Sequence, residues 1–339
     1  MTSTTPSRRA TIADVAARAG VSRATVSRVM NGLSTVEPAI ADRVRTAAAA
    51  LSYRPSETAR NLSLGRTHTV AVVVPDLGNP MFQAILRGVT RAAAKDGYRV
   101  LVGDTQEKTA AEMDAAIEAR RRCDALVLCA PRMDDDRLAQ VVGATAPLAL
   151  VNRIVADEAV PQVAMDYGQA IGLIVDHLEG LGHRHLMYLG GPTASASNRL
   201  RIAALDAAVQ RHPELRINRL TIGAGLDDGW AGADRVLESG ATAVVAYNDL
   251  VALGLLSRLR ELGIDVPSRL SVVGVDDIPY ARFSDPALTT VSVPQDELGV
   301  AVWERLHEAM EGRSPQGPLW LEGTLQSRDS SGPPPRRAR

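Results

Sequence analysis

From Thr69 onward the chain alternates short apolar runs with longer amphipathic segments, and this alternation restricts the possible folds more than any other feature. A first series contains VAVVVP, RVLVGD, ALVLCAP and LALVN, and a second contains HLMYLGG, AVVAYND and SVVGVDD. Apolar runs of strand length separated by amphipathic helices are typical of β-α-β units and a parallel sheet. The two series predict an α/β body of two doubly wound lobes over residues 67–331.

Length and composition agree with a multidomain globular protein. The 339 residues suit about two domains with a large core. No stretch approaches about 18 uninterrupted apolar residues, and no apolar segment follows the polar residues 1–9, so we expect a cytoplasmic protein without a membrane partner. Cys123 and Cys129 show neither CxxC spacing nor a nearby histidine. We interpret them as buried thiols and expect no metal and no cofactor.

The charge is unevenly distributed along the chain. Residues 1–65 contain nine arginines against four acidic residues, a net charge of +5, although the whole chain carries −1. A basic head on an acidic body is the electrostatic pattern of a nucleic-acid-binding module joined to a second unit. At the other end, residues 332–339 (GPPPRRAR) have no large apolar side chain to bury, so we expect a disordered tail there.

The basic head carries the signals of a helix pair within residues 11–32. Thr11 and Ser22 are residues that cap helix N-termini, Gly20 lies in a short turn between the two helices, and Asn31 with Gly32 ends the second. Two short helices joined by a glycine-containing turn form a helix-turn-helix, whose second helix enters the major groove of DNA. Apolar residues at helical spacing over 37–53 predict a third helix, so the headpiece spans residues 1–55.

The second helix of this pair offers side chains for reading bases. Arg23, Ala24, Ser27 and Arg28 lie off its buried face. Arginine pairs with guanine O6 and N7, and alanine contacts the thymine methyl group. Alternatively these are ordinary surface residues of an amphipathic helix pair, but the charge of +5 favours DNA contact.

The string TIADVAARAGVSRATVSRVMNG, followed by LSYRPSETARNLSLG, resembles the DNA-binding headpiece of the LacI/GalR family of bacterial transcription regulators. The resemblance implies a hinge helix and linker at residues 56–66, folded only on DNA, whose Leu62 wedges into the minor groove. A linker leucine packed on the body is the alternative for Leu62. The expected DNA contacts are Thr11, Ser22, Arg23, Ala24, Thr25, Ser27, Arg28, Asn31, Tyr53 and Leu62.

The body resembles the same family through strings such as VPDLGNPMF, NRLRIAAL, AYNDLVALG and SVVGVDDIP. This implies the two-lobed fold of periplasmic sugar-binding proteins, a ligand cleft between the lobes and a homodimer. The expected effector contacts are Asn79, Phe82, Asn152, Arg201, Asn248, Asp276 and Gln295. Four of them have a structural alternative: a capping carboxylate for Asp276, a turn residue for Asn248, a salt bridge for Arg201 and a core position for Phe82.

The sequence thus predicts a transcription regulator, most simply a repressor, that reads a palindromic operator as a dimer and responds to a sugar or sugar derivative. Carboxylate, amide and guanidinium groups suit vicinal hydroxyls. Because only 3% of residues are aromatic, a non-sugar effector such as a nucleobase or nucleoside stays open. An enzyme or a sugar-binding protein fused to a DNA-binding head is disfavoured, since the chain lacks GxxxxGKS/T, HExxH, GxSxG and a GxGxxG after a strand.

Overall fold

The computed structural model describes residues 10–31, 35–53, 66–313 and 317–335. The chain divides into two compact units, Met1–His68 and Thr69–Arg339. Leu62 and the rest of the predicted hinge helix, together with Gly32, lie outside the described residues. No described helix is long and apolar enough to cross a membrane.

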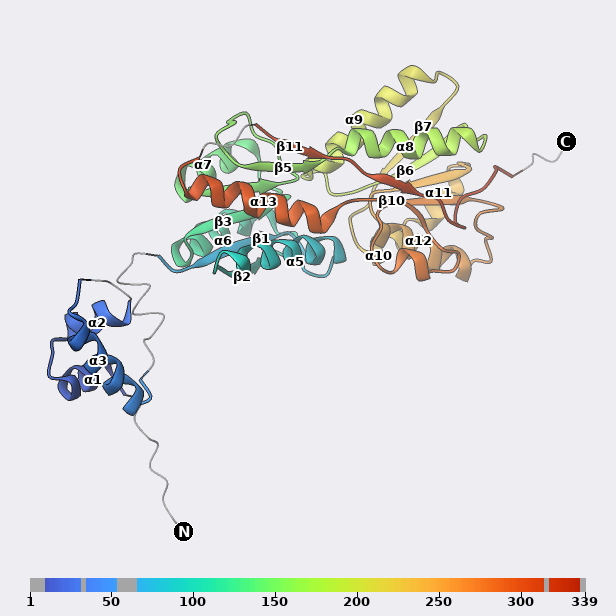
Figure 1. The fold of residues 1–339 in the computed structure, drawn as a ribbon. Coiled ribbons are helices and arrows are strands. Elements are labelled where there is room, and N and C mark those ends of the chain that lie inside the picture. Colours follow the sequence, from blue (N-terminus) through green and yellow to red (C-terminus); the bar gives the residue numbers. More distant parts are fainter. Residues whose placement is uncertain (1–9, 32–34, 54–65, 314–316, 336–339) are drawn as a thin grey trace, which may run out of the picture. The chain divides into compact units, whose positions relative to one another are not determined.

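The first unit contains three helices, coloured blue in Figure 1: α1 (Ile12–Ala19), α2 (Arg23–Met30) and α3 (Pro38–Ala50). Thr11 caps α1 in a capping box with Asp14, and Gly20 ends it in the left-handed conformation at φ 66°. Ser22 caps α2 by accepting a hydrogen bond from the backbone N–H of Thr25. The predicted helix pair is confirmed. The third helix is shorter than predicted, because the chain turns at Ser52 with φ 47°.

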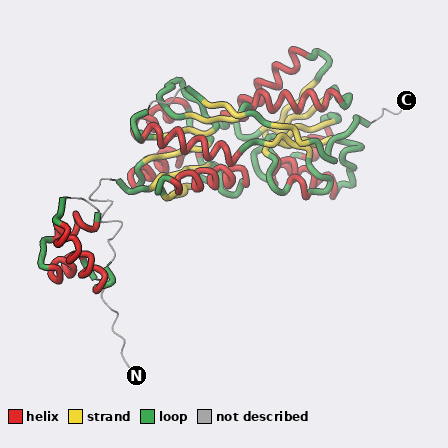
Figure 2. Tube along the Cα trace, in the orientation of Figure 1, coloured by secondary structure: helices red, strands yellow, loops and turns green. Residues whose placement is uncertain are grey.

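The first lobe of the body is a six-stranded parallel sheet in the order β11-β5-β4-β3-β1-β2. Figure 2 shows its strands in yellow between layers of red helices. Its elements are β1 (Thr69–Val74), α5 (Pro80–Lys95), β2 (Arg99–Asp104), α6 (Thr109–Arg122), β3 (Ala125–Cys129), α7 (Asp135–Thr145), β4 (Leu148–Val151), β5 (Gln162–Met165), α13 (Gln295–Met310) and β11 (Leu319–Leu321).

The second lobe has a sheet in the order β12-β10-β9-β8-β6-β7, parallel except for the antiparallel pair of β10 and β12. Its elements are α8 (Tyr167–Gly180), β6 (His185–Gly190), α9 (Ala196–Arg211), β7 (Arg216–Thr221), α10 (Leu226–Ala231), α11 (Ala233–Glu238), β8 (Ala243–Ala246), α12 (Asp249–Glu261), β9 (Ser271–Asp276), β10 (Thr289–Ser292) and β12 (Thr324–Gln326). The predicted two lobes are confirmed. Two short helices, α10 and α11, follow each other within this lobe and are separated at Gly232.

The chain crosses between the lobes after β5, after β10 and between β11 and β12. The second crossing sends α13 back onto α5 of the first lobe (Figure 1). These helices meet at two glycines. A Cβ on Gly88 would collide with the carbonyl oxygen of Asp296, and one on Gly299 with that of Ile85. Backbone contact this close requires a residue without a side chain.

The C-terminal segment is ordered beyond its predicted limit. The carbonyl oxygen of Gly332 accepts hydrogen bonds from Ser271 at 3.1 Å and bonds with the Nε2 atom of the His183 ring at 2.8 Å. The backbone N–H of Gly332 donates to Ser271 Oγ at 3.0 Å. These bonds attach Gly332, the first residue of the segment predicted as a disordered tail, to β9 and to His183. Residues 336–339 lie outside the described residues.

Candidate functional site

The ends of three strands carry unusual backbone conformations. Ala130 follows β3 with φ 44°, Asn152 follows β4 with φ 54°, and Asp276 ends β9 with φ 118°. A non-glycine residue at positive φ costs about 1–3 kcal/mol and persists only where the surrounding structure enforces it, most often at functional sites. Carboxyl ends of parallel strands are also where open α/β sheets bind ligands. Backbone and topology therefore mark the same region of the body.

Arg201 of α9 lies buried between two aromatic rings. Its guanidinium carbon is 3.9 Å from the ring centre of Tyr167 and 4.5 Å from that of Tyr247. The Tyr247 hydroxyl in turn bonds with the hydroxyls of Ser195 at 3.0 Å and Ser197 at 3.2 Å, both at the start of α9. Tyrosine faces stabilise the cation without using its N–H donors. The guanidinium is therefore held in place with donors still available.

Buried polar atoms without a partner gather at this end of the lobes. Among the described residues they include Nε and Nη1 of Arg201, Oδ1 of Asp276, Nδ2 of Asn152 and Nη1 of Arg153. Each unpaired buried group costs about 1–3 kcal/mol. A ligand that formed hydrogen bonds with these unpaired atoms would remove this free-energy cost. Arg201 and Asp276 together offer paired donors and an acceptor, which suits neighbouring hydroxyl groups.

Burial changes the acidity of these groups. It raises the pKa of Asp276 to about 7, against the opposing effect of the Arg201 charge. Burial also raises the pKa of the adjacent Asp249 well above its usual value, and the charge of Asp276 adds to the rise. Burial alone would raise the pKa of the Tyr247 phenol, but Arg132, Arg201 and the serine hydroxyls outweigh it and lower that pKa. Strongly shifted groups in one place are typical of functional sites.

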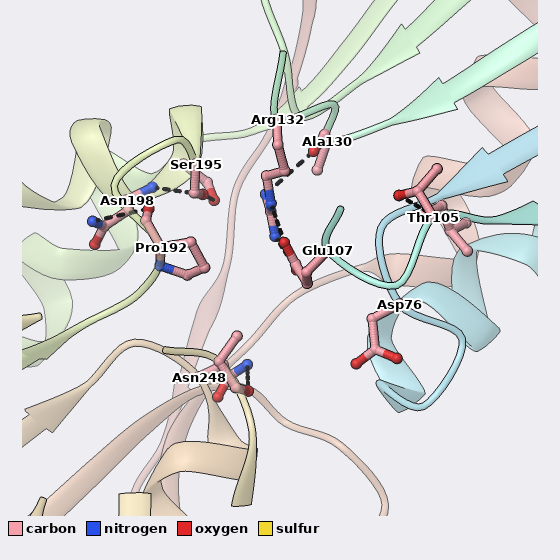
Figure 3. A network of polar contacts seen from close by, with 12 residues as sticks. Asp76, Thr105, Glu107, Ala130, Arg132, Pro192, Ser195, Asn198 and Asn248 are labelled. Carbon is pink, nitrogen blue, oxygen red and sulfur yellow. Dashed lines mark hydrogen bonds and ion pairs between the residues drawn. The ribbon is translucent and has the colours of Figure 1, made fainter. Parts of the chain in front are cut away.

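An ion pair that no sequence pattern indicates lies in the same region, between Arg132 after β3 and Glu107 after β2. Arg132 Nε and Nη2 donate to the two Glu107 carboxylate oxygens at 2.8 and 2.7 Å, and Nη1 donates to the Ala130 carbonyl at 3.2 Å. Figure 3 shows this pair facing Asn248 of the other lobe. Both residues follow the carboxyl ends of strands, as Asn248 does, but no pattern in the sequence indicates that the two pair.

Asn79 and Asn248 are used as helix caps. Asn79 Oδ1 accepts from the N–H of Met81, and Asn248 Oδ1 accepts from that of Val251, each at 2.9 Å. Asn248 Nδ2 also donates to the Ala224 carbonyl at 2.9 Å. Asn248 thus has a structural role as the N-cap of α12, and its contact with an effector stays a prediction.

The remaining predicted effector contacts have different surroundings. Gln295 donates from Nε2 to the Asp276 carbonyl oxygen, at the crossing into α13. Asn152 Oδ1 accepts from the N–H of Met165 at 2.9 Å, which leaves its Nδ2 unpaired. Phe82 packs in the main apolar core and is buried. Phe82 thus occupies the core position given as its alternative.

In the headpiece, the predicted contacts on α2 lie on the outer side of the helix pair. Arg23, Ala24 and Arg28 are exposed, whereas Val26 and Val29 are buried. No ion pair involves Arg23 or Arg28 within the described part of the chain. The remaining contacts are half-buried or support the helices: Thr11 and Ser22 are caps, Thr25 and Ser27 bond with Ser22 and Asn31, and Tyr53 is half-buried.

Comparisons with known proteins match both units. The lacI family of bacterial regulatory proteins matches residues 11–56, and the periplasmic binding protein-like domain matches residues 175–331. The chain is 35% identical over 290 residues to the HTH-type transcriptional regulator GalS of Salmonella typhimurium, across 84% of this chain and 85% of GalS.

Solved structures with similar folds include the Lac repressor dimer bound to operator and the anti-inducer ONPF. It has a TM-score of 0.85 at 27% identity and covers 96% of this chain and 100% of that one. The complex of the transcriptional regulator CelR with cellobiose has a TM-score of 0.68 at 28% identity, covering 95% and 100%.

A helix-turn-helix unit joined to a two-lobed, periplasmic-binding-protein-like body defines a class of DNA-binding regulators. This chain belongs to the lacI family of bacterial regulatory proteins, and it is a DNA-binding transcriptional regulator.

Proposed function

We propose that this regulator represses transcription as a homodimer on a palindromic operator, and that a small polyhydroxylated molecule, a sugar or sugar derivative, controls its operator affinity from between the lobes. The single observation that carries the effector is the buried pair of Arg201 and Asp276, whose Nε, Nη1 and Oδ1 atoms have no partner. The relative CelR was solved with cellobiose, which supports a sugar. Because its target is chromosomal DNA, we place the protein in the cytoplasm.

Large exposed apolar side chains support dimerisation. Phe283 is 73% exposed, Tyr280 59% and Leu226 50%, all in the second lobe. Exposed apolar patches on a folded protein mark interaction surfaces. The relative solved with operator is a dimer, and two identical heads related by a twofold axis would read the two halves of a palindrome.

Allosteric control follows from the position of the effector contacts. Arg201 and Asp276 belong to the second lobe, whereas Asn152 and the Arg132–Glu107 pair belong to the first. A ligand that bonds groups of both lobes favours one lobe arrangement, and its differential affinity sets the shift. Whether that shift releases or strengthens operator binding is an outcome of the experiment.

Selection of purified protein against a random DNA library at moderate salt tests the first part of the proposal. We expect a palindrome with a flexible central step, which the hinge residues 56–66 with Leu62 would kink. The affinity of the protein for the selected operator is then measured during titration with pentoses, hexoses, disaccharides and nucleosides, and a change in that affinity identifies an effector. A response to nucleosides alone would show that the effector is a nucleoside and not a sugar. Absence of any enriched palindrome would contradict the proposal that a dimer binds a palindromic operator.

A further inference from the structure

A pocket with a volume of about 410 Å³ lies between the lobes. Strands β4, β5 and β11 of the first lobe form one side, and the first turns of α9 in the second lobe form the other. Arg201, Asn248 and Asp276 do not line it. Tyr167 does, and the same ring carries the Arg201 guanidinium at 3.9 Å. The pocket is therefore set apart from Arg201 and Asp276, but it shares Asn152 with the expected effector contacts and adjoins Arg201 through Tyr167.

Two buried donors in the lining have no partner. Arg153 is 3% exposed, and its Nη2 donates to the Met133 carbonyl at 3.2 Å and to Asp135 Oδ1 at 2.6 Å, but its Nη1 is unpaired. The amide Nδ2 of Asn152 is unpaired as well. Asp135 is largely exposed, so water screens its attraction for Arg153. Both residues line the pocket, so a ligand acceptor that reached these two nitrogens would supply the partners they lack.

The charge of the lining favours an anion. Arg153 and the exposed Arg199 face the pocket together with a single carboxylate, that of Asp135. Burial lowers the pKa of Arg153, and the nearby charge of Arg199 contributes to the lowering. Two guanidinium groups close enough to disfavour each other are stabilised by a negative charge bound between them.

The opposite part of the lining is apolar and broad. Trp320 of β11 is 43% exposed and Leu200 of α9 is 41% exposed, and both line the pocket. An indole ring with an open face offers a stacking surface for a planar group. The pocket therefore presents a flat apolar side and a cationic side.

We propose that this pocket binds a small planar carboxylate, with the carboxylate on Arg153 and Asn152 and the ring against Trp320. Because its lining comes from both lobes and includes Tyr167, the bound acid acts as a second effector that changes the lobe arrangement. The carboxylate could belong to a free aromatic acid or to the acidic end of a larger molecule.

The test uses the full chain and fluorine NMR of para-fluorophenylacetate, with para-fluorophenylacetamide as its neutral counterpart. We expect saturable binding of the acetate and binding at least about tenfold weaker for the amide, because the amide lacks charge-assisted hydrogen bonds. Arg153→Gln should weaken acetate binding by about the same factor. Arg137→Gln is the matched control, since Arg137 is an exposed residue of α7 that pairs with Asp134 outside the pocket lining.

Leu200→Trp fills the pocket from α9 and should abolish acetate binding even if Arg153→Gln fails to fold. Leu237→Trp is its control, at a similarly exposed leucine on α11. Asp276→Asn distinguishes the two sites: a probe bound beside Arg201 would bind more tightly once the Asp276 charge is removed, whereas one in this pocket is unaffected. Absence of saturable binding, equal affinity for acid and amide, unchanged binding in Leu200→Trp or tighter binding in Asp276→Asn would each overturn the proposal.

Discussion

Arg132 and Glu107 are joined by two hydrogen bonds of 2.8 and 2.7 Å, which tie the loop after β3 to the loop after β2. The Arg132 side chain is 3% exposed and that of Glu107 30%. The pair is thus buried at one end and reached by water at the other. It holds the first lobe's contribution to the region that faces Asn248 in a fixed shape (Figure 3).

We expect Glu107→Gln to lower the free energy of unfolding by about 2 kcal/mol, because it leaves a buried guanidinium without its counter-charge. The loss is smaller than for a fully buried pair, since Glu107 is partly hydrated. Urea denaturation measures it. Glu118→Gln is the control: its pair with Arg122 is exposed on both sides, so its removal should cost at most about 0.5 kcal/mol. Equal losses in the two variants would show that the Arg132 pair is not a structural contact.

The pKa of Asp276 predicts a pH dependence of stability. Burial raises this pKa to about 7 in the folded chain, against about 3.9 when unfolded. The folded state therefore favours the protonated acid, and its stabilising contribution is lost as the pH rises from about 4 to about 7. Between pH 5 and pH 8, wild type should lose about 2–3 kcal/mol relative to Asp276→Asn. The free energy of unfolding of both proteins is measured by urea denaturation across this pH range. If it changes with pH in the same way in both, Asp276 does not have the raised pKa that its burial implies.

The crossing of α5 and α13 predicts a sharp difference between two glycines. Gly88→Ala places a Cβ against the Asp296 carbonyl oxygen, and we expect a loss of about 2–3 kcal/mol as the helices separate. Gly143→Ala is in the exposed part of α7 with open space around the new Cβ. It should be neutral or stabilise by up to about 1 kcal/mol. Thermal melts followed by circular dichroism distinguish the two outcomes.

Arg23 and Arg28 should each read bases rather than merely attract phosphates. Replacing either by Ala should cost about 1–3 kcal/mol on the selected operator and relax the preference at one base pair per half-site. Arg45→Ala is the control, because Arg45 is on α3 and pairs with Asp42 at 2.8 Å. Fluorescence anisotropy with single-base operator variants measures both effects. A uniform loss on all operator variants would assign Arg23 and Arg28 to the phosphate backbone.

Periodicity and capping residues were sufficient to predict the helix pair of the head and the two lobes, because each depends on local sequence signals. Thr11 and Ser22 cap the two helices, and Gly20 forms the turn between them, as these residue types favour. The bonding of Gly332 to His183 and Ser271 depends on contact between segments that are distant in the sequence. Such contacts leave no periodic signal in the chain.

The candidate site was predicted unevenly for a similar reason. The family resemblance implies Arg201 and Asp276 as effector contacts, and both are buried with unpaired atoms. Asn248 and Asn79 were also selected, but a capping asparagine and a ligand-binding asparagine have the same sequence surroundings. Arg132 and Glu107 were missed, because only the tertiary fold shows that the two residues pair.

The central claim is that a ligand on Arg201 and Asp276 controls operator affinity. Operator binding should be measured by anisotropy across the effector panel, in wild type, Arg201→Gln, Asp276→Asn and the control Arg211→Gln at the exposed end of α9. We predict that the active effector changes wild-type and Arg211→Gln affinity by about 5- to 150-fold. Arg201→Gln and Asp276→Asn should bind operator as wild type does and lose that response. An undiminished response in both variants would contradict the account.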